Sequence, residues 1–113
     1  MKMKRDVIEG IAVIGPAEPV QIDINNIDRF QAAFESMLQE GDRDVVLDAT
    51  HVEFFDSAGM GGLLSLQKQV QQRSGQLVVA SLNRSVAEVF RMIGFDMVFP
   101  TYPDAEQAVN SLK

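Results

Sequence analysis

The chain contains no cysteine and no tryptophan. Without cysteine there can be no disulfide framework, no thiolate metal site and no cysteine nucleophile, which fits a reducing compartment. The first ten residues, MKMKRDVIEG, lack an apolar stretch of signal-peptide length. No run of residues approaches the roughly 18 apolar positions that a membrane span needs. We therefore expect a cytoplasmic protein that does not insert into a membrane.

Positive charge is also scarce. Lysine and arginine number 10 against 16 acidic residues, so the formal net charge is −6, and the basic residues form no stripe along the chain. Nucleic-acid binding depends on lysine and arginine that neutralise phosphates, and stacking of bases depends on aromatic side chains. Aromatic residues make up only 7% of the chain. We expect no nucleic-acid partner.

What the chain does contain is ordinary for one globular domain. It has 113 residues, of which 46% are hydrophobic and 23% charged. This is enough to build one hydrophobic core, and no linker, internal repeat or low-complexity tract divides the sequence. We expect a single domain over residues 1–113, present as a monomer or weak dimer.

Short apolar runs predict the strands. Residues 7–8 and 11–14 flank a Glu9-Gly10 turn signal, which favours a β-hairpin. Gly15-Pro16 is expected to end the second run, and Pro19 to keep the next stretch irregular or extended. Further strands are expected at residues 45–47, 52–55, 77–80 and 97–99.

Helical periodicity predicts four helices. From residue 27 to residue 40 the apolar side chains recur on one helical face, with Asn25 or Asn26 as the cap and Gly41 as the stop. The other helices are expected at residues 57–74, 86–93 and 105–112. The order is β-β-α-β-α-β-α-β-α, which predicts an α/β fold with a mixed, mostly parallel sheet and an antiparallel edge from the hairpin.

The segment FFDSAGMGG, residues 54–62, is the most unusual part of the chain. Phe54 and Phe55 are both expected to anchor the end of a strand in the core. Asp56 or Ser57 then caps a helix, and three glycines follow in its first turns although glycine weakens a helix interior. The glycines leave the serine hydroxyl uncovered, at the end of a strand where ligand and partner sites collect in α/β sheets.

Enzymatic signatures are missing around this serine. The single histidine, His51, lies six residues before Ser57, and Phe55 stands where a nucleophile elbow needs glycine. His51, Glu53 and Asp56 alternate faces of an extended segment, which disfavours a metal site. No lysine follows the glycines as a phosphate-binding loop requires, since the next one is Lys68. We expect no enzyme, no cofactor and no metal.

An exposed serine at a helix N-terminus is well placed to accept a phosphate. The positive end of the helix dipole tolerates the added negative charge, so the fold survives modification. Phosphorylation adds about −1.5 to −2 charges to the surface. Beside Asp56, that charge can eject a bound partner.

The residues VVLDATHVEFFDSAGMGGLLSLQKQV and GQLVVASLNRSVAEVFRMIGF resemble the STAS domain of bacterial anti-sigma factor antagonists. An apolar strand, Asp-Ser-x-Gly-x-Gly, a helix, a second strand and a helix ending before Gly-apolar occur in register. The resemblance implies that Ser57 is phosphorylated by a serine kinase that is itself the anti-sigma factor. It also implies that the unphosphorylated domain binds this kinase and that a metal-dependent serine phosphatase restores it.

The implied partner surface combines the serine loop, the exposed face of the following helix and the start of the third helix. Its residues are Asp56, Ser57, Ala58, Gly59, Met60, Gly61, Leu64, Lys68, Asn83, Arg84 and Ser85. The exposure of Met60 stays open, because a helical methionine is more often a core residue.

Two positions depart from the family pattern. Many members have serine or threonine after the phosphorylated serine, where this chain has Ala58, so only Ser57 can take the phosphate within the motif. The stretch that begins at Gly15-Pro16-Ala17-Glu18 replaces a family loop that usually lies beside the serine. Other uses of the domain stay open: regulation of biofilm or secretion, a constitutive subunit of a lipid transporter, or binding of a nucleotide or another small ligand.

Overall fold

The computed structural model describes residues 1–113 as seven strands, four α-helices and one 3-10 helix. The strands are β1 (Met3–Ile8), β2 (Ile11–Pro16), β3 (Val20–Ile22), β4 (Val45–Asp48), β5 (Val52–Phe55), β6 (Leu77–Ala80) and β7 (Thr101–Tyr102). The helices are α1 (Ile27–Met37), α2 (Ser57–Gln72), α3 (Arg84–Met92), η1 (Phe95–Met97) and α4 (Ala105–Ser111).

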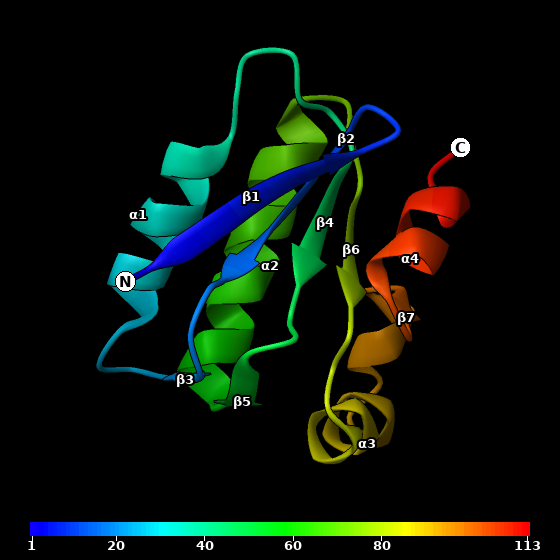
Figure 1. The fold of residues 1–113 in the computed structure, drawn as a ribbon. Helices are drawn as coiled ribbons and strands as arrows, with labels where there is room; N and C mark the ends of the chain where they lie inside the picture. Colours follow the sequence, from blue (N-terminus) through cyan, green and yellow to red (C-terminus); the bar gives the residue numbers. More distant parts are fainter.

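Five strands form the main sheet in the order β1-β2-β4-β6-β7 (Figure 1). β1 and β2 pair antiparallel, whereas β2, β4, β6 and β7 run parallel. The predicted α/β class and the mixed, mostly parallel sheet are confirmed. β3 and β5 form a separate parallel pair beyond the main sheet, which the sequence did not indicate.

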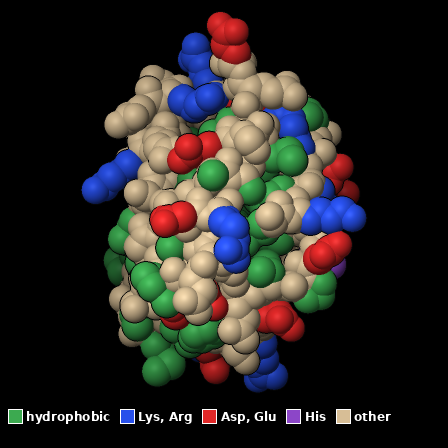
Figure 2. Space-filling view, turned by 90° about the vertical axis from the view of Figure 1, so that its left-hand side faces the viewer, with side chains coloured by type: hydrophobic (Ala, Val, Ile, Leu, Met, Phe, Trp, Pro, Cys, Tyr) green, Lys and Arg blue, Asp and Glu red, His purple; other side chains and the backbone are tan.

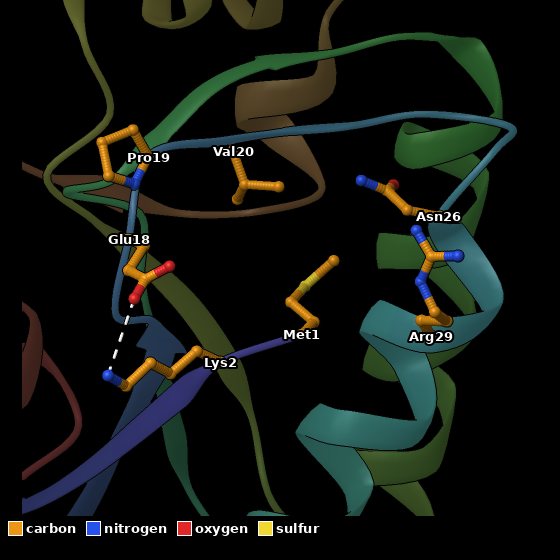
Figure 3. Close-up of a pocket in the computed structure, with 7 residues that line it drawn as sticks. All are labelled: Met1, Lys2, Glu18, Pro19, Val20, Asn26 and Arg29. Atoms are coloured by element: carbon orange, nitrogen blue, oxygen red, sulfur yellow. Dashed lines mark ion pairs between the residues drawn. The ribbon is translucent and has the colours of Figure 1, made fainter.

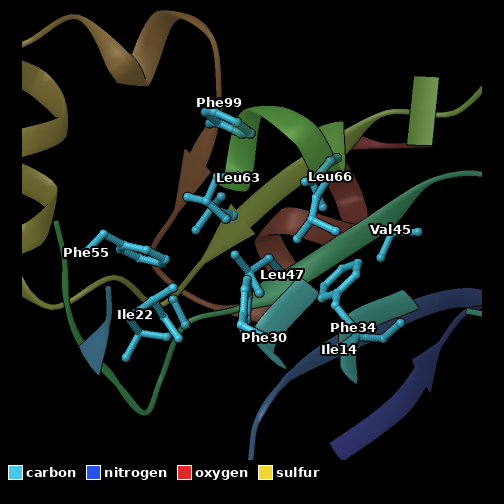
Figure 4. Packing of buried hydrophobic residues seen from close by; sticks show 14 of the residues in the cluster. Ile14, Ile22, Phe30, Phe34, Val45, Leu47, Phe55, Leu63, Leu66 and Phe99 are labelled. Atoms are coloured by element: carbon cyan, nitrogen blue, oxygen red, sulfur yellow. The ribbon is translucent and has the colours of Figure 1, made fainter. Parts of the chain in front are cut away.

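The core lies on both faces of this sheet. The larger cluster joins alternate residues of β2, β4 and β6, including Ile14 and Leu47, to α1, α2 and α3. Figure 4 shows Phe30, Phe34 and Leu63 pointing with them into one shared space. A smaller cluster packs the other sheet face against α4. Because β4 and β6 are buried on both faces, every residue in them is apolar except the terminal Asp48.

The hairpin forms as predicted, but β2 is longer than expected. Glu9 and Gly10 both have positive φ, 50° and 82°, as a tight hairpin turn requires. The strand then continues through Gly15 and Pro16, so the prediction that they end it was wrong. Pro16 pairs with Met3 at the last position of the β1–β2 ladder, where the missing N–H of proline is tolerated.

The predicted helices are present with shifted ends. α1 stops at Met37, because Leu38 turns to extended backbone before Gly41 is reached. α2 ends at Gln72 and not at residue 74. The helix N-caps are Asn26, Asp56, Asn83 and Asp104, and all but Asn26 accept with the side chain from a backbone N–H in the first turn of their own helix.

The predicted strand at residues 97–99 was wrong. Gly94, with φ 78°, ends α3, and the chain enters the 3-10 helix Phe95–Met97. Only Phe99 of the three is buried, while Met97 is 88% exposed. The last sheet strand forms two residues later, at Thr101–Tyr102. A three-residue apolar run does not distinguish a strand from a turn that buries one aromatic ring.

Candidate functional site

Ser57 is the first residue of α2 and is exposed to solvent directly after β5. Asp56 is the N-cap, and its Oδ1 accepts a hydrogen bond from the Gly59 N–H at 2.8 Å. Because Asp56 supplies the cap, the Ser57 hydroxyl is not needed to cap the helix. The serine stands at the positive end of a 16-residue helix, where a negative charge is stabilised.

Asp56 also joins α2 to the end of β3. Its Oδ2 accepts a hydrogen bond from the Ile24 N–H at 3.1 Å, and its own N–H donates to the Ile22 carbonyl at 3.1 Å. The stretch that begins at Gly15 was expected beside the serine. Only its last part, Ile22 and Ile24, is bonded to the residue before the serine. Gly15, at the beginning of that stretch, packs instead against the backbone of Asp48.

Two of the three glycines in the motif serve internal packing. A Cβ on Gly59 would overlap the carbonyl oxygen of Ile22, and one on Gly62 would overlap the side chain of Ile27. Gly61 has nothing within 4 Å of the same position and is exposed. Only Gly61 thus keeps a side chain off the open face. Gly59 is buried and shapes the site from within.

The two phenylalanines before Asp56 differ. Phe55 is fully buried, and its ring centroid lies 5.9 Å from that of Phe90 on α3. Phe54 is 42% exposed, so the prediction that both rings anchor the strand end was wrong. Successive residues of a strand point to opposite faces, and only one face of β5 meets the core.

The outward face of α2 continues the surface from Ser57. Leu64 is 37% exposed and Lys68 is exposed as well. Met60 is half-buried and packs against the main core, and Ala58 is half-buried.

The start of α3 is tied to the strand that carries the motif. Asn83 caps α3 by accepting from the Val86 N–H at 2.9 Å, and its Nδ2 donates to the Glu53 carbonyl of β5 at 3.0 Å. Arg84 and Ser85 are exposed in the first turn. One side chain thereby connects the third helix to the strand that leads to Ser57.

Several large apolar side chains are exposed to solvent, which the sequence did not indicate. Ile24 is 70% exposed, and Met92 and Met97 are 80% and 88% exposed. Figure 2 shows hydrophobic side chains gathered at the lower end of the face it views, the end at which Figure 1 places β3, β5 and the start of α2. The Gln67 side chain donates to the Val98 carbonyl at 2.8 Å, which holds the segment after η1 against α2.

The two carboxylates with a shifted pKa, Asp48 and Asp42, lie outside the Ser57 site and stabilise the fold. Burial alone would raise the pKa of Asp48, but hydrogen bonds from Thr50 and the charge of Lys4 outweigh it, so the pKa is lowered. Arg5 donates to both oxygens of Asp42, at 2.6 and 3.1 Å, and this lowers the pKa of Asp42. Both groups stay ionised at neutral pH and take no part in the Ser57 site.

The cavities of the molecule are small. One of about 240 Å³ lies between the N-terminal end of β1, the segment before β3 and the start of α1 (Figure 3). Lys2 pairs with Glu18 across one wall at 3.6 Å, while Asn26 and Arg29 stand on the other. A second, of about 260 Å³, lies beside Leu82 and Tyr102. Both are smaller than the roughly 300–1,000 Å³ of typical small-molecule sites.

No group of three or more His, Asp or Glu side chains is arranged to hold a metal ion. None of the helices has both the length and the apolar composition that crossing a membrane would require.

Known proteins share both the sequence pattern and the fold. BtrV of Bordetella bronchiseptica, named as a candidate anti-sigma factor antagonist, is 33% identical over all 113 residues and 96% of its own length. A candidate anti-sigma factor antagonist of Thermotoga maritima has the same fold with a TM-score of 0.82 at 20% identity, covering 97% of this chain and 93% of its own.

The anti-sigma factor antagonist SpoIIAA is also similar. Its unphosphorylated form aligns with a TM-score of 0.71 at 16% identity, over 96% of this chain and 94% of SpoIIAA. Its phosphorylated form, from Bacillus, aligns with a TM-score of 0.61 at 15% identity over 98% of this chain and 99% of SpoIIAA. The family model described as the STAS domain matches residues 2–108. The chain belongs to the STAS domain family.

Proposed function

We propose that this protein is an anti-sigma factor antagonist in a partner-switching pathway, controlled by phosphorylation of Ser57. In its unphosphorylated form it binds an anti-sigma factor that is also a serine kinase. Transfer of a phosphate to Ser57 breaks the complex, and a metal-dependent serine phosphatase removes the phosphate again. The observation that carries the proposal is an exposed serine at the start of α2 whose helix cap is supplied by its neighbour.

Access to the hydroxyl supports the role of Ser57 as acceptor. A kinase must bring the γ-phosphate of its nucleotide in line with the serine oxygen, so nothing bulky can stand around it. Next to the serine on the helix, Ala58 carries only a methyl group and Gly61 carries no side chain. Gly61 also has open space where a Cβ would lie.

The charge around the site supports the release step. The serine follows Asp56, and the whole chain carries a net charge of −6. A phosphate would add about −1.5 to −2 charges at the centre of the contact surface. A charge buried without a partner in an interface costs about 3–5 kcal/mol, which corresponds to a loss of affinity of at least about 100-fold.

The relatives support the same reading. BtrV is similar over the full chain and is named for anti-sigma factor antagonism. SpoIIAA is described in a phosphorylated and an unphosphorylated form, as a switch requires. The proposed contact surface on this chain comprises Ser57, Ala58, Gly61, Leu64 and Lys68, together with Arg84 and Ser85 at the start of α3.

The test is titration calorimetry with the purified anti-sigma kinase encoded in the same genome. Wild type and Ser57→Ala should bind alike, because the alanine variant changes neither charge nor shape appreciably. Ser57→Glu and the phosphorylated wild type should bind at least about 100-fold more weakly. Equal affinity of all four forms would contradict the proposal.

A further inference from the structure

The loop between β3 and α1 exposes one isoleucine, Ile24, to solvent. Ile24 is 70% exposed. The loop around it is fixed by its own side chains. Asp23 Oδ1 accepts from the Asn25 N–H at 2.9 Å, and Asn26 Oδ1 accepts from the Asp23 N–H at 2.9 Å. Asn26 Nδ2 also donates to the Gln21 carbonyl at 2.6 Å. A large apolar side chain thus stands in water on an ordered loop.

The same loop is bonded to the residue before the phosphorylation site. The Ile24 N–H donates to Asp56 Oδ2 at 3.1 Å, while Asp56 Oδ1 accepts from the Gly59 N–H at 2.8 Å. One carboxylate therefore fixes two things at once, the first turn of α2 and the position of Ile24. This places the isoleucine at the edge of the Ser57 surface.

The residues nearest to Ser57 cannot supply much binding energy themselves. A stable protein contact buries about 800 Å² on each partner, and a few large side chains at its centre carry most of the affinity. Ala58 and Gly61 are too small for that role. An apolar side chain on a rigid loop suits it well, because little conformational freedom is lost when the partner binds.

We propose that Ile24 is an apolar anchor for the anti-sigma kinase and that Asp56 is the residue that positions it. The inference rests on the proposed function and assigns to the kinase an apolar pocket next to its bound nucleotide, which receives Ile24. Asp56 acts through the loop, so its effect on binding is separable from its role as the helix cap.

Two variants separate these roles. Ile24→Ser removes the apolar side chain from an exposed position and leaves the fold intact. Asp56→Asn keeps the cap, because asparagine is as good an N-cap as aspartate and its Oδ1 can accept from Gly59. Its Nδ2 carries only donors and cannot accept from the Ile24 N–H. Val7→Ser is the matched control, because Val7 is 57% exposed and lies next to the turn of the β1–β2 hairpin. This turn and the start of α2 lie at opposite ends of the molecule in Figure 1.

We expect Ile24→Ser to weaken binding of the kinase by about 10- to 100-fold, as the loss of one buried isoleucine predicts. Val7→Ser should bind like wild type. In Asp56→Asn, the backbone order parameter at Ile24 measured by ¹⁵N relaxation should fall from about 0.85 toward about 0.6, while that at Gly59 stays unchanged. Thermal unfolding of each variant confirms that it is folded.

The outcomes distinguish the inference from the function. If Ile24→Ser binds as tightly as wild type while phosphorylated wild type fails to bind, the anchor is wrong and the switch stands. If Ile24 stays rigid in Asp56→Asn, the positioning role of Asp56 is wrong. If phosphorylation of Ser57 changes nothing, the proposed function is wrong and the anchor assignment fails with it.

Discussion

Replacing Gly59 with alanine should destabilise the fold, although the same change is normally favourable in a helix. The new Cβ would overlap the carbonyl oxygen of Ile22, and that oxygen is fixed by a hydrogen bond from the Asp56 N–H. Relief of the overlap requires the first turn of α2 to move away from β3. Such a movement stretches the hydrogen bond from Ile24 to Asp56 as well.

The magnitude follows from two opposing effects. Overpacking a well-packed site costs about 1–3 kcal/mol, and a backbone atom yields less readily than a side chain. The gain in helix propensity from glycine to alanine is about 0.8–1.0 kcal/mol. We expect a net destabilisation of about 1–2 kcal/mol, which corresponds to a fall in Tm of roughly 4–15 °C for a domain of this size.

Gly61→Ala is the matched control. Gly61 lies two residues further along α2 with open space at the Cβ position, so only the gain in propensity applies. This variant should be more stable than wild type by up to about 1 kcal/mol. Urea denaturation of the three proteins checks both values. A Gly59→Ala variant as stable as Gly61→Ala would refute the view that Gly59 is required by the close approach of β3.

Two further predictions concern side chains that hold the scaffold. Arg5 lowers the pKa of Asp42 below its ordinary 3.8, so the ion pair stabilises the fold above that pH and the contribution is lost as the pH falls through the lowered value. Asp42→Asn should therefore lose about 1–3 kcal/mol at neutral pH but little in strong acid, measured by urea denaturation at both pH values. Asn83→Ala should lose about 1–2 kcal/mol by removing the cap on Val86, whereas Asn83→Asp keeps the cap, loses the bonds from Nδ2 to the carbonyls of Val52 and Glu53, and should lose less.

The helices and the strands of the main sheet other than β7 could be predicted because their patterns are local. β4 and β6 are buried on both faces, which gives continuous apolar runs, and α1 repeats its apolar residues with the period of a helix. The pair of β3 and β5 could not be predicted in the same way. β3 has only three residues, and whether Phe54 or Phe55 faces the core depends on where β5 lies relative to α3.

In the candidate site, too, the residues set by local sequence could be predicted, and those set by long-range contacts could not. Ser57 and Asp56 could be found from the motif, because a cap and an exposed serine at a strand-to-helix junction are features of neighbouring residues. Ile24 could not, since its bond to Asp56 joins residues 32 positions apart. The distinction between Gly59 and Gly61 depends on the approach of Ile22, which no periodicity encodes.

The proposed switch depends on Ser57 being the phosphate acceptor of a cognate anti-sigma kinase. Its most direct test is intact-mass analysis after incubation of the full chain with that kinase, Mg²⁺ and ATP. We expect wild type to gain the mass of one phosphate group, Ser57→Ala to gain none, and the modified wild type to leave the kinase on a sizing column. A phosphate gained equally by Ser57→Ala, or a modified protein that stays bound, would contradict the account.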